Sequence, residues 1–271
     1  MRSRGTAPLD LTGKRALITG ASGGLGTAIA RALAERGASL IVTGRQRDAL
    51  DNLVRALDAE MIVCDVAKPD ELAHVLDAAV KVDVLVSNAG IPASGALQDF
   101  SVEQIDRAIA VNLRAPLLLA RAASAAMADR GFGHIVFVSS ISAKLPGRAQ
   151  ALYSATKAGL RASALAIRED LHGTGVTVSV VLPGPVSDAG MWAETGLAAQ
   201  AGKMKQSRPS DVADAVLAAM TRNRAEIDVM SAQLRFMSAL ALLRPSWAAA
   251  MTRKGSKEFA AAMVEAHRHK W

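Results

Sequence analysis

The chain has 271 residues, of which 51% are hydrophobic and 21% charged, which excludes a disordered chain and suits one globular domain with a full core. Its single cysteine, Cys64, excludes an internal disulfide and a cysteine-only metal site, and we expect no bound metal. No apolar run follows the charged N-terminus or reaches the ~18 residues that a membrane-spanning helix needs, so we expect a cytoplasmic protein.

The net charge of +7 is concentrated near the C-terminus. Residues 203–271 contain 12 Lys and Arg but only 6 Asp and Glu, and the rest of the chain is nearly balanced. A basic tail is most simply a solvated surface, but it could also attract phosphate-bearing ligands or make peripheral contact with an anionic membrane. It lacks interleaved aromatic residues and any nucleic-acid-binding motif, so we expect no nucleic-acid partner.

A glycine-rich turn, Gly20-Ala-Ser-Gly-Gly-Leu-Gly26, follows the first predicted strand, residues 14–19, and leads into a helix predicted over residues 27–36. Glycine lets the backbone approach a pyrophosphate, and the helix N-terminus supplies N–H donors. The spacing differs from the commoner G-x-G-x-x-G fingerprint, and any tight turn favours glycine, so the turn alone is weak evidence for a dinucleotide site.

Strands and helices then alternate along the chain. Pro69 opens one helix, Ser101 and Gln104 fit a capping box, and Ser210 is a predicted cap. Further strands are predicted at residues 39–43, 61–64, 82–87, 134–139, 176–182 and 225–230. One further helix ends near residue 57, and another begins at residue 69. The remaining helices are predicted over residues 101–130, 149–172 and 210–221. This alternation predicts an α/β fold, a single doubly wound Rossmann-type parallel sheet with helices on both faces.

Two segments depart from the alternation. Residues 186–209 form a long connection that contains Met191, Trp192, Leu197 and Met204, which favours a lid or binding loop over an ordinary surface excursion. Residues 231–271 predict one or two helices with an apolar stripe. That stripe could pack on the substrate loop, contact a second copy or dock on an anionic membrane.

We expect residues 1–230 to form a catalytic and dinucleotide-binding domain and residues 231–271 to form a helical C-terminal extension packed on it. A parallel sheet binds its ligands at the carboxyl ends of its strands. The extension leaves the last strand at that edge, so we expect it to help close the substrate site.

Tyr153 and Lys157 lie four residues apart on a predicted helix and therefore on the same face. An ammonium group there favours the phenolate of its neighbour, which makes Tyr153 a candidate proton donor and acceptor. Ser140 follows the apolar strand at residues 134–139 and offers a hydroxyl at its end. An isolated Y-x-x-x-K pattern is more often an ordinary surface pair, so the assignment depends on the other motifs.

Seven motifs occur in the order and at the spacing of one family: Thr19-Gly20-x-x-x-Gly24-x-Gly26, Asp65, Asn88-Ala89-Gly90, Asn112, Ser140, Tyr153-x-x-x-Lys157 and Pro183-Gly184. Over residues 9–230 the chain resembles a classical short-chain dehydrogenase/reductase. The resemblance implies that Tyr153 is the general acid and base, that Lys157 lowers its pKa and binds the cofactor ribose, and that Ser140 binds the substrate oxygen. It also implies that Asn112 holds a water that connects Lys157 to solvent; the alternative is a helix residue that bonds its own backbone.

The same resemblance implies a nicotinamide dinucleotide cofactor. Asp65 would contact the adenine, and Asn88 to Gly90 would form the floor beneath adenine and ribose, although Asn88 could equally be a structural tie between strands. The residues assigned to cofactor binding are Gly20, Ser22, Gly24, Leu25, Gly26, Arg45, Asp65, Val66, Asn88, Ala89, Gly90, Tyr153, Lys157, Pro183, Gly184 and Val186.

The end of the second strand indicates which dinucleotide binds. An NAD site has an acid about 20 residues past the glycine turn, whereas an arginine there suits the 2′-phosphate of NADP. Here Thr43-Gly44-Arg45 occupies that place and no acid follows until Asp48. A guanidinium matches a phosphate in forked geometry, so we expect NADP in preference to NAD, with a solvated Arg45 as the alternative.

One substitution departs from the family pattern: Asp188 stands where a Thr near the nicotinamide carboxamide is usual, which puts that contact in question. The resemblance and the apolar loop and tail predict an NADP(H)-dependent oxidoreductase that interconverts a carbonyl and a secondary alcohol on a hydrophobic substrate. The alternative is a dinucleotide-binding regulatory or scaffold protein without turnover. We also expect a homodimer or homotetramer.

Overall fold

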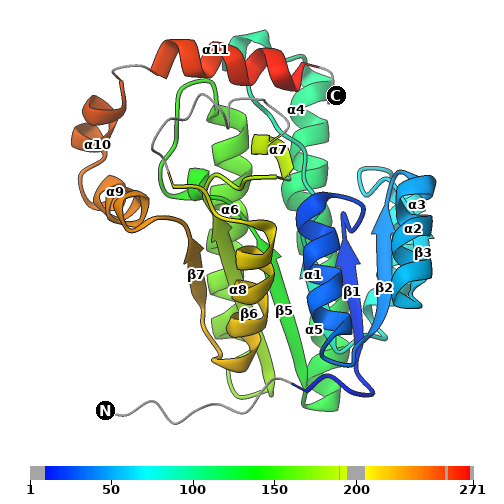
Figure 1. The fold of residues 1–271 in the computed structure, drawn as a ribbon. Helices are drawn as coiled ribbons and strands as arrows, with labels where there is room; N and C mark the ends of the chain where they lie inside the picture. Colours follow the sequence, from blue (N-terminus) through cyan, green and yellow to red (C-terminus); the bar gives the residue numbers. More distant parts are fainter. Residues whose placement is uncertain (1–9, 189, 194–204, 254–255, 269–271) are drawn as a thin grey trace.

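The computed structural model describes residues 10–188, 190–193, 205–253 and 256–268. One sheet of seven parallel strands, in the order β3-β2-β1-β4-β5-β6-β7, forms its centre (Figure 1). The strands are β1 (Arg15–Thr19), β2 (Ser39–Gly44), β3 (Glu60–Val63), β4 (Val84–Ser87), β5 (Gly133–Val138), β6 (Val176–Pro183) and β7 (Glu226–Val229). The predicted doubly wound parallel sheet is confirmed, and every predicted strand lies within two residues of its observed bounds.

Helices cover both faces of the sheet (Figure 1). One face carries α1 (Gly24–Ala34), α2 (Arg47–Leu57) and α8 (Pro209–Thr221), and the other carries α3 (Pro69–Ala79), α5 (Ala115–Arg130) and α6 (Ala151–Asp170). Side chains alternate between the two faces along each strand. Leu17 on β1 therefore packs with α3, α5 and α6, while its neighbour Ile18 packs with α1, α2 and α8.

The strand order reverses between β1 and β4. The crossovers after these two strands leave in opposite directions, which opens a crevice at the carboxyl ends of the strands where dinucleotide ligands bind. The fold therefore brings the ends of β1, β4 and β5 to one edge, together with the motifs that follow them.

The helix predicted over residues 101–130 has three parts: α4 (Val102–Ile109), a π-helical turn (Ala110–Arg114) and α5. Its N-terminus has the predicted capping box, in which the Gln104 backbone N–H donates to Ser101 Oγ at 3.2 Å and the Ser101 N–H donates to Gln104 Oε1 at 3.0 Å. The continuous helix Val102–Arg130 is long and apolar enough by length and composition to cross a membrane, contrary to the expectation for the sequence. It lies against the sheet and buries Leu119 and Met127 there, as a core helix does.

Two other predictions need correction. The helix α8 begins at Pro209, and Arg208 precedes it as the N-cap residue in place of Ser210, because Asp211 Oδ2 accepts from the Arg208 backbone N–H at 2.7 Å. The extension contains three helices, where one or two were predicted: α9 (Ala232–Leu243), α10 (Pro245–Thr252) and α11 (Ser256–His267). Pro245 separates the first two by starting a new helix. A four-residue helix, α7 (Gly190–Ala193), lies in the connection after β6.

Candidate active site

Two cavities open at the carboxyl edge of the sheet and share Leu25, Asn88 and Pro92. The first, of about 310 Å³, is lined by the glycine turn and the ends of β2, β3 and β4, and we name it the dinucleotide cavity. The second, of about 280 Å³, is lined by Ser140, Tyr153 and Lys157 and by parts of the loop after β6 and of the extension, and we name it the substrate cavity. The shared wall makes the two cavities neighbours at the point where the strand order reverses.

Glycine is required at two positions of the turn in the dinucleotide cavity. Gly20 has a φ of +65°, and a Cβ there would lie 2.8 Å from the Ala89 Cα atom. A Cβ at Gly26 would lie 2.2 Å from the Gly20 carbonyl oxygen. Because α1 begins at Gly24, the turn directs the helix N-terminus and its backbone N–H groups to this cavity. Ser22 and Leu25 also line it, in agreement with their predicted places.

Asn88 fastens the end of β4 to the turn. Its Nδ2 donates to the carbonyl oxygens of Thr19 and Gly20, both at 3.1 Å. The Thr19 Oγ1 accepts from the backbone N–H groups of Asn88 at 3.1 Å and of Ala89 at 3.0 Å. The side chain of Asn88 therefore ties the two strand ends together. Asn88 also lines both cavities, whereas Ala89 and Gly90 line only the dinucleotide cavity among the described linings.

Charged side chains surround the far end of the dinucleotide cavity. Arg107 donates to Asp65 Oδ2 at 2.7 Å, and Asp65 Oδ1 accepts from the Ala67 N–H at 3.0 Å. Burial alone would raise the pKa of Asp65, but these bonds and the nearby charges of Arg107 and Arg45 together lower it. Arg45 itself is exposed at the rim of the cavity, and Val66 is buried in its wall. Arg45 thus brings positive charge to the same hollow as the glycine turn, whereas the charge of Arg107 is paired with Asp65.

Ser140, Tyr153 and Lys157 come together in the substrate cavity. Ser140 follows β5 and caps a short 3-10 turn (Ile141–Ala143), where its Oγ accepts from the Ser142 N–H at 3.2 Å. Tyr153 and Lys157 lie one turn apart on α6, with Lys157 Nζ at 5.8 Å from the centre of the tyrosine ring. Lys157 also donates to the Val138 carbonyl oxygen at 3.1 Å, which holds the ammonium group at the end of β5.

Burial sets the pKa values of this pair. It raises the pKa of Tyr153 to about 12, although a hydrogen bond with Ser140 acts in the opposite direction. It lowers the pKa of Lys157 to about 8. The expected net lowering of the Tyr153 pKa is therefore wrong for this structure, in which burial raises that pKa. The physical reason is that loss of solvation penalises the charged form of each group.

Asn112 lies in the π-helical turn and is fully buried. Its Oδ1 accepts from the Ile91 N–H at 2.8 Å, and its Nδ2 donates to the Ile91 carbonyl at 3.0 Å and to Thr156 Oγ1 at 3.3 Å. The alternative that Asn112 bonds its own helix backbone is thus wrong. The side chain joins the loop after β4 to the helix α6, one residue before Lys157.

The loop after β6 supplies the predicted residues Pro183, Gly184 and Val186 to the wall of the substrate cavity. Asp188, the departure from the family pattern, is exposed, has a φ of +62°, and accepts from Ser187 Oγ at 2.8 Å. It is absent from the described lining of both cavities. Of the apolar residues noted in this loop, Trp192 lines the substrate cavity, whereas Leu197 and Met204 lie outside the described residues.

The extension contributes Leu234 from α9 and Met263 and His267 from α11 to the substrate cavity. His267 is only 2% exposed, and its Nδ1 lies 3.0 Å from Ser94 Oγ, on the loop after β4. Our sequence reasoning did not identify His267 or Ser94, because 173 positions separate them and neither belongs to a local pattern. Within the described ranges no three His, Cys, Asp or Glu side chains gather in a way that could hold a metal ion.

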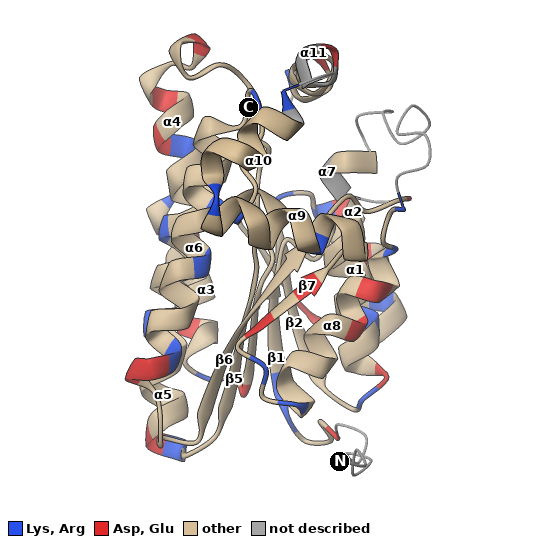
Figure 2. Cartoon of the chain, turned by 90° about the vertical axis from the view of Figure 1, so that its left-hand side faces the viewer, with Lys and Arg blue, Asp and Glu red and all other residues tan. Residues whose placement is uncertain are grey.

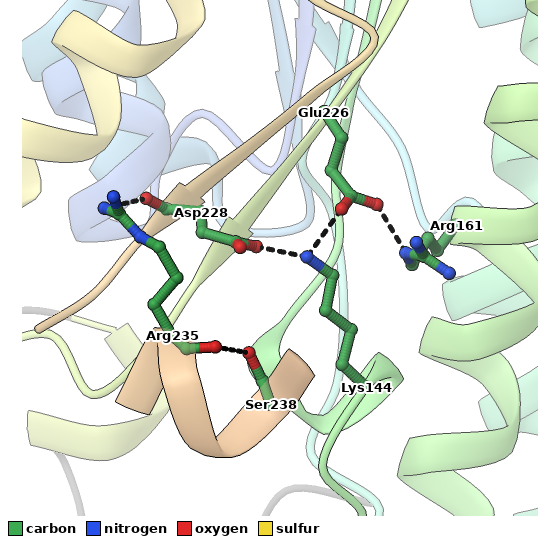
Figure 3. Close-up of polar contacts among 6 residues, drawn as sticks. All are labelled: Lys144, Arg161, Glu226, Asp228, Arg235 and Ser238. Carbon is green, nitrogen blue, oxygen red and sulfur yellow. Dashed lines mark hydrogen bonds and ion pairs between the residues drawn. The ribbon is translucent and has the colours of Figure 1, made fainter. Parts of the chain in front are cut away.

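An ion-pair cluster with a buried lysine and partly buried partners lies beside the Ser140 turn (Figure 3). Lys144 Nζ contacts Glu226 Oε1 at 2.5 Å and Asp228 Oδ1 at 2.7 Å, both on β7, and Arg161 on α6 pairs with the other oxygen of Glu226. Arg235 on α9 donates to the Asp228 carbonyl at 3.3 Å. This cluster, which the sequence analysis missed, connects the segment after Ser140 to α6, β7 and the extension.

The comparisons with known proteins agree with this geometry. The profile of the short chain dehydrogenase family matches residues 14–199. The ketoacyl reductase HetN of Nostoc sp. is 38% identical over 229 residues, which cover 81% of this chain and 79% of that protein. The 3-oxoacyl-(acyl-carrier-protein) reductase FabG of Rickettsia felis is 37% identical over 178 residues, which cover 65% of this chain and 74% of that protein.

Among solved structures, a short-chain dehydrogenase from Sphingobium yanoikuyae in complex with NADPH has a TM-score of 0.76 to this chain at 27% identity, with 86% of this chain and 94% of that chain covered. The site and the comparisons define a dinucleotide-dependent oxidoreductase. The chain belongs to the short-chain dehydrogenase family, as its motifs predicted.

Proposed function

We propose that this enzyme uses NADP(H) to interconvert a carbonyl group and a secondary alcohol on a hydrophobic substrate. The observation that carries the proposal is the apolar substrate cavity, which contains Ser140 and Tyr153 and shares a wall with the dinucleotide cavity. Its apolar lining comes from several elements: Leu25, Pro92, Ile141, Leu145, Pro185, Trp192, Leu234 and Met263. Two relatives are named as reductases of ketoacyl or 3-oxoacyl compounds, so we propose 3-oxoacyl thioesters as the first substrates to test.

The residues of the dinucleotide cavity fit NADP. The glycine turn leaves its backbone bare where a Cβ would collide, so phosphates can approach the N–H groups at the start of α1. Arg45 supplies positive charge at the other end, where a 2′-phosphate needs it, whereas Arg107 is already paired with Asp65. Pro183, Gly184 and Val186 lie at the substrate end, where the nicotinamide ring would be held. When bound, this cofactor supplies or accepts the hydride.

The chain's own residues would manage the proton. The Tyr153 phenol donates its proton to the substrate oxygen during reduction, and the phenolate takes a proton from the alcohol during oxidation. Ser140 donates a hydrogen bond to the same oxygen as negative charge develops there. The Lys157 ammonium stabilises the phenolate, and its hydrogen bond to Val138 keeps it below the ring. Asn112 positions Thr156 and thereby the turn of α6 that carries Lys157.

The direct test is NADPH oxidation, followed by absorbance, with 3-oxoacyl thioesters, bulky aromatic ketones and small polar ketones as separate substrates. We expect turnover with the hydrophobic ketones. Tyr153→Phe should retain NADPH binding and lose about 10²- to 10⁴-fold in kcat, the usual contribution of general acid catalysis. A loss of less than about tenfold in kcat would show that Tyr153 is not the general acid.

The alternative, a regulatory or scaffold protein that binds a dinucleotide without turnover, predicts tight NADPH binding and no oxidation with any ketone. Ser140, Tyr153 and Lys157 gathered in one cavity favour the enzyme. A cytoplasmic location and a homodimer or homotetramer complete the proposal. Sedimentation velocity of the purified protein tests the oligomeric state.

A further inference from the structure

The outer faces of α9 and α10 are apolar and exposed. On α9 the residues Ala232, Phe236, Ala239 and Leu243 recur at helical spacing and all are exposed, with Phe236 at 68% and Leu243 at 79%. Ser238 and Ala241, on the opposite side, are buried against the body of the protein. Most amphipathic helices bury their apolar stripe, so α9 is unusual in exposing one.

The next helix, α10, also exposes large apolar residues. Trp247 and Met251 lie one turn apart and are 58% and 52% exposed, whereas Ala248 is buried. The two helices contact each other, and Leu242 next to their junction is also exposed. We call the exposed residues Phe236, Leu242, Leu243, Trp247 and Met251 the tail patch. A single exposed apolar residue needs no explanation, but five large ones on two helices in contact indicate an interaction surface.

The charge around the tail patch has one sign. Residues 231–253 contain the three arginines Arg235, Arg244 and Arg253 and no aspartate or glutamate. Figure 2 shows this side of the molecule, with α9 and α10 carrying only basic and uncharged residues. A second copy of the chain meeting this patch about a two-fold axis would bring these arginines against their counterparts. The charge therefore disfavours self-association here and suits an anionic partner.

We propose that the tail patch docks the protein on the surface of an anionic lipid membrane. An interfacial helix pair needs an exposed apolar face rimmed by cationic side chains, with aromatic residues at the headgroup level. Phe236, Leu243 and Trp247 supply the exposed apolar and aromatic side chains. Arg235 and Arg244 supply the cationic side chains. The helices α9 and α10 lie on the opposite side of the molecule from α1, and neither contributes to the described lining of the dinucleotide cavity, so docking leaves that cavity open (Figure 1). The inference does not depend on the proposed reaction.

Co-sedimentation with lipid vesicles tests the proposal. The full chain should bind vesicles of phosphatidylcholine containing about one third phosphatidylglycerol, and binding to pure phosphatidylcholine should be at least about tenfold weaker. Raising the salt from ~0.05 M to ~0.5 M should reduce binding, because salt screens the attraction between the arginines and the anionic headgroups. Phe236→Ser and Leu243→Ser should each weaken binding about tenfold, and Arg235→Gln with Arg244→Gln about fivefold per charge.

Val102→Ser is the matched control, because Val102 is 69% exposed on α4, apart from the tail patch. It should leave vesicle binding unchanged. Quenching of tryptophan fluorescence by brominated lipids should be present in the full chain and largely lost in Trp247→Phe. The proposal is overturned if the full chain does not bind the anionic vesicles. It is also overturned if Phe236→Ser and Leu243→Ser bind as the full chain does, or if they change only the sedimentation coefficient, which would assign the patch to a contact between copies.

Discussion

At the scale of single residues, the pKa of Lys157, which burial lowers, determines how the reaction rate depends on pH. Its pKa is lowered to about 8, while that of Tyr153 is raised to about 12. As the pH rises, the ammonium therefore loses its proton before the phenol does. Ketone reduction needs the charged Lys157 to stabilise the phenolate, so we predict that the reduction rate falls as the pH rises through about 8. Initial rates at saturating NADPH, measured between about pH 6 and 10, give the profile.

Lys157→Arg is the control for this profile. A guanidinium keeps its charge over the whole range, so the variant, though slower, should lose the inflection near pH 8. Circular dichroism at each pH separates a change in rate from unfolding. A wild-type reduction rate that stays constant to about pH 9.5 would show that Lys157 does not limit the reaction in this way.

Arg45 is predicted to select the cofactor. It is exposed at the rim of the dinucleotide cavity, and no acid follows it in the sequence until Asp48. Arg45→Ala should raise the Kd of NADPH about 10- to 100-fold, the value of a charge-assisted hydrogen bond, and should change that of NADH little. Arg47→Ala removes another exposed arginine outside the cavity and should have no effect on either Kd. Equal Kd values for NADPH and NADH in the unmodified protein would refute the preference.

Residues that act through short spacings could be placed from the sequence, and residues that act through distant contacts could not. Tyr153 and Lys157 share one helix, and Ser140 follows a strand, so a local sequence pattern predicted the position of all three. His267 meets Ser94 only because the extension folds back over the substrate cavity. The pKa directions also required the structure, because burial and not the neighbouring charge decides them.

At the scale of elements, the cluster around Lys144 fastens the Ser140 turn to β7. Lys144 is buried between Glu226 and Asp228. Burial alone would raise the pKa of Glu226, but the bonds from Arg161 and Lys144 outweigh it and lower the pKa. Lys144→Met leaves two carboxylates without that partner, and we expect the free energy of unfolding to fall by about 3 kcal/mol, as for other broken buried pairs. Urea denaturation measures the change.

Lys68→Met is the matched comparison, because Lys68 pairs with Glu71 at a similar distance of 2.8 Å but is mostly exposed. Solvent screens such a pair, so its loss should lower the free energy of unfolding far less than the loss of Lys144 does. If the two variants are equally stable, the Lys144 cluster does not hold the turn. Lys144→Arg keeps the charge and should recover part of the stability.

Helices and strands with a clear local sequence pattern were predicted more accurately than those without one. The strands are apolar runs bounded by turns, so their positions were found to within two residues. The π-helical turn at Ala110–Arg114 was missed, because an extra residue in a helix leaves the apolar periodicity nearly intact. The three helices of the extension were merged into one or two, because the break before α11 has no proline.

At the scale of the whole molecule, the two cavities divide the sheet between them. The dinucleotide cavity takes its lining from residues between Gly20 and Val111, near β1 to β4. Apart from the shared wall and Ser94, the substrate cavity takes its lining from Val138 onward, near β5, β6 and the extension. The alternation of strands and helices predicted this division, since a doubly wound sheet has one half on each side of the reversal. The extension was predicted to lie at the substrate site because the last strand ends at that edge, and Leu234, Met263 and His267 do line the substrate cavity. The periodicity of the extension did not predict which of its side chains face the cavity.

This division yields a prediction about α11. Removing residues 256–271 takes Met263 and His267 from the substrate cavity and leaves every described residue of the dinucleotide cavity in place. Water would then reach the space where the hydride moves. We expect kcat/KM for a hydrophobic ketone to fall at least about tenfold, while the Kd of NADPH changes less than about twofold. Thermal unfolding of the truncated protein checks that the sheet is intact.

Point variants keep this prediction testable if the truncated protein does not fold. His267→Ala and Ser94→Ala each remove one side of the 3.0 Å contact that fastens α11 to the loop after β4. If that contact closes the cavity, the double variant should lose less kcat/KM than the two single losses combined, because both changes break the same contact. Additive losses would mean that each residue acts separately on the substrate. Full kcat/KM in the truncated protein would mean that α11 does not close the cavity.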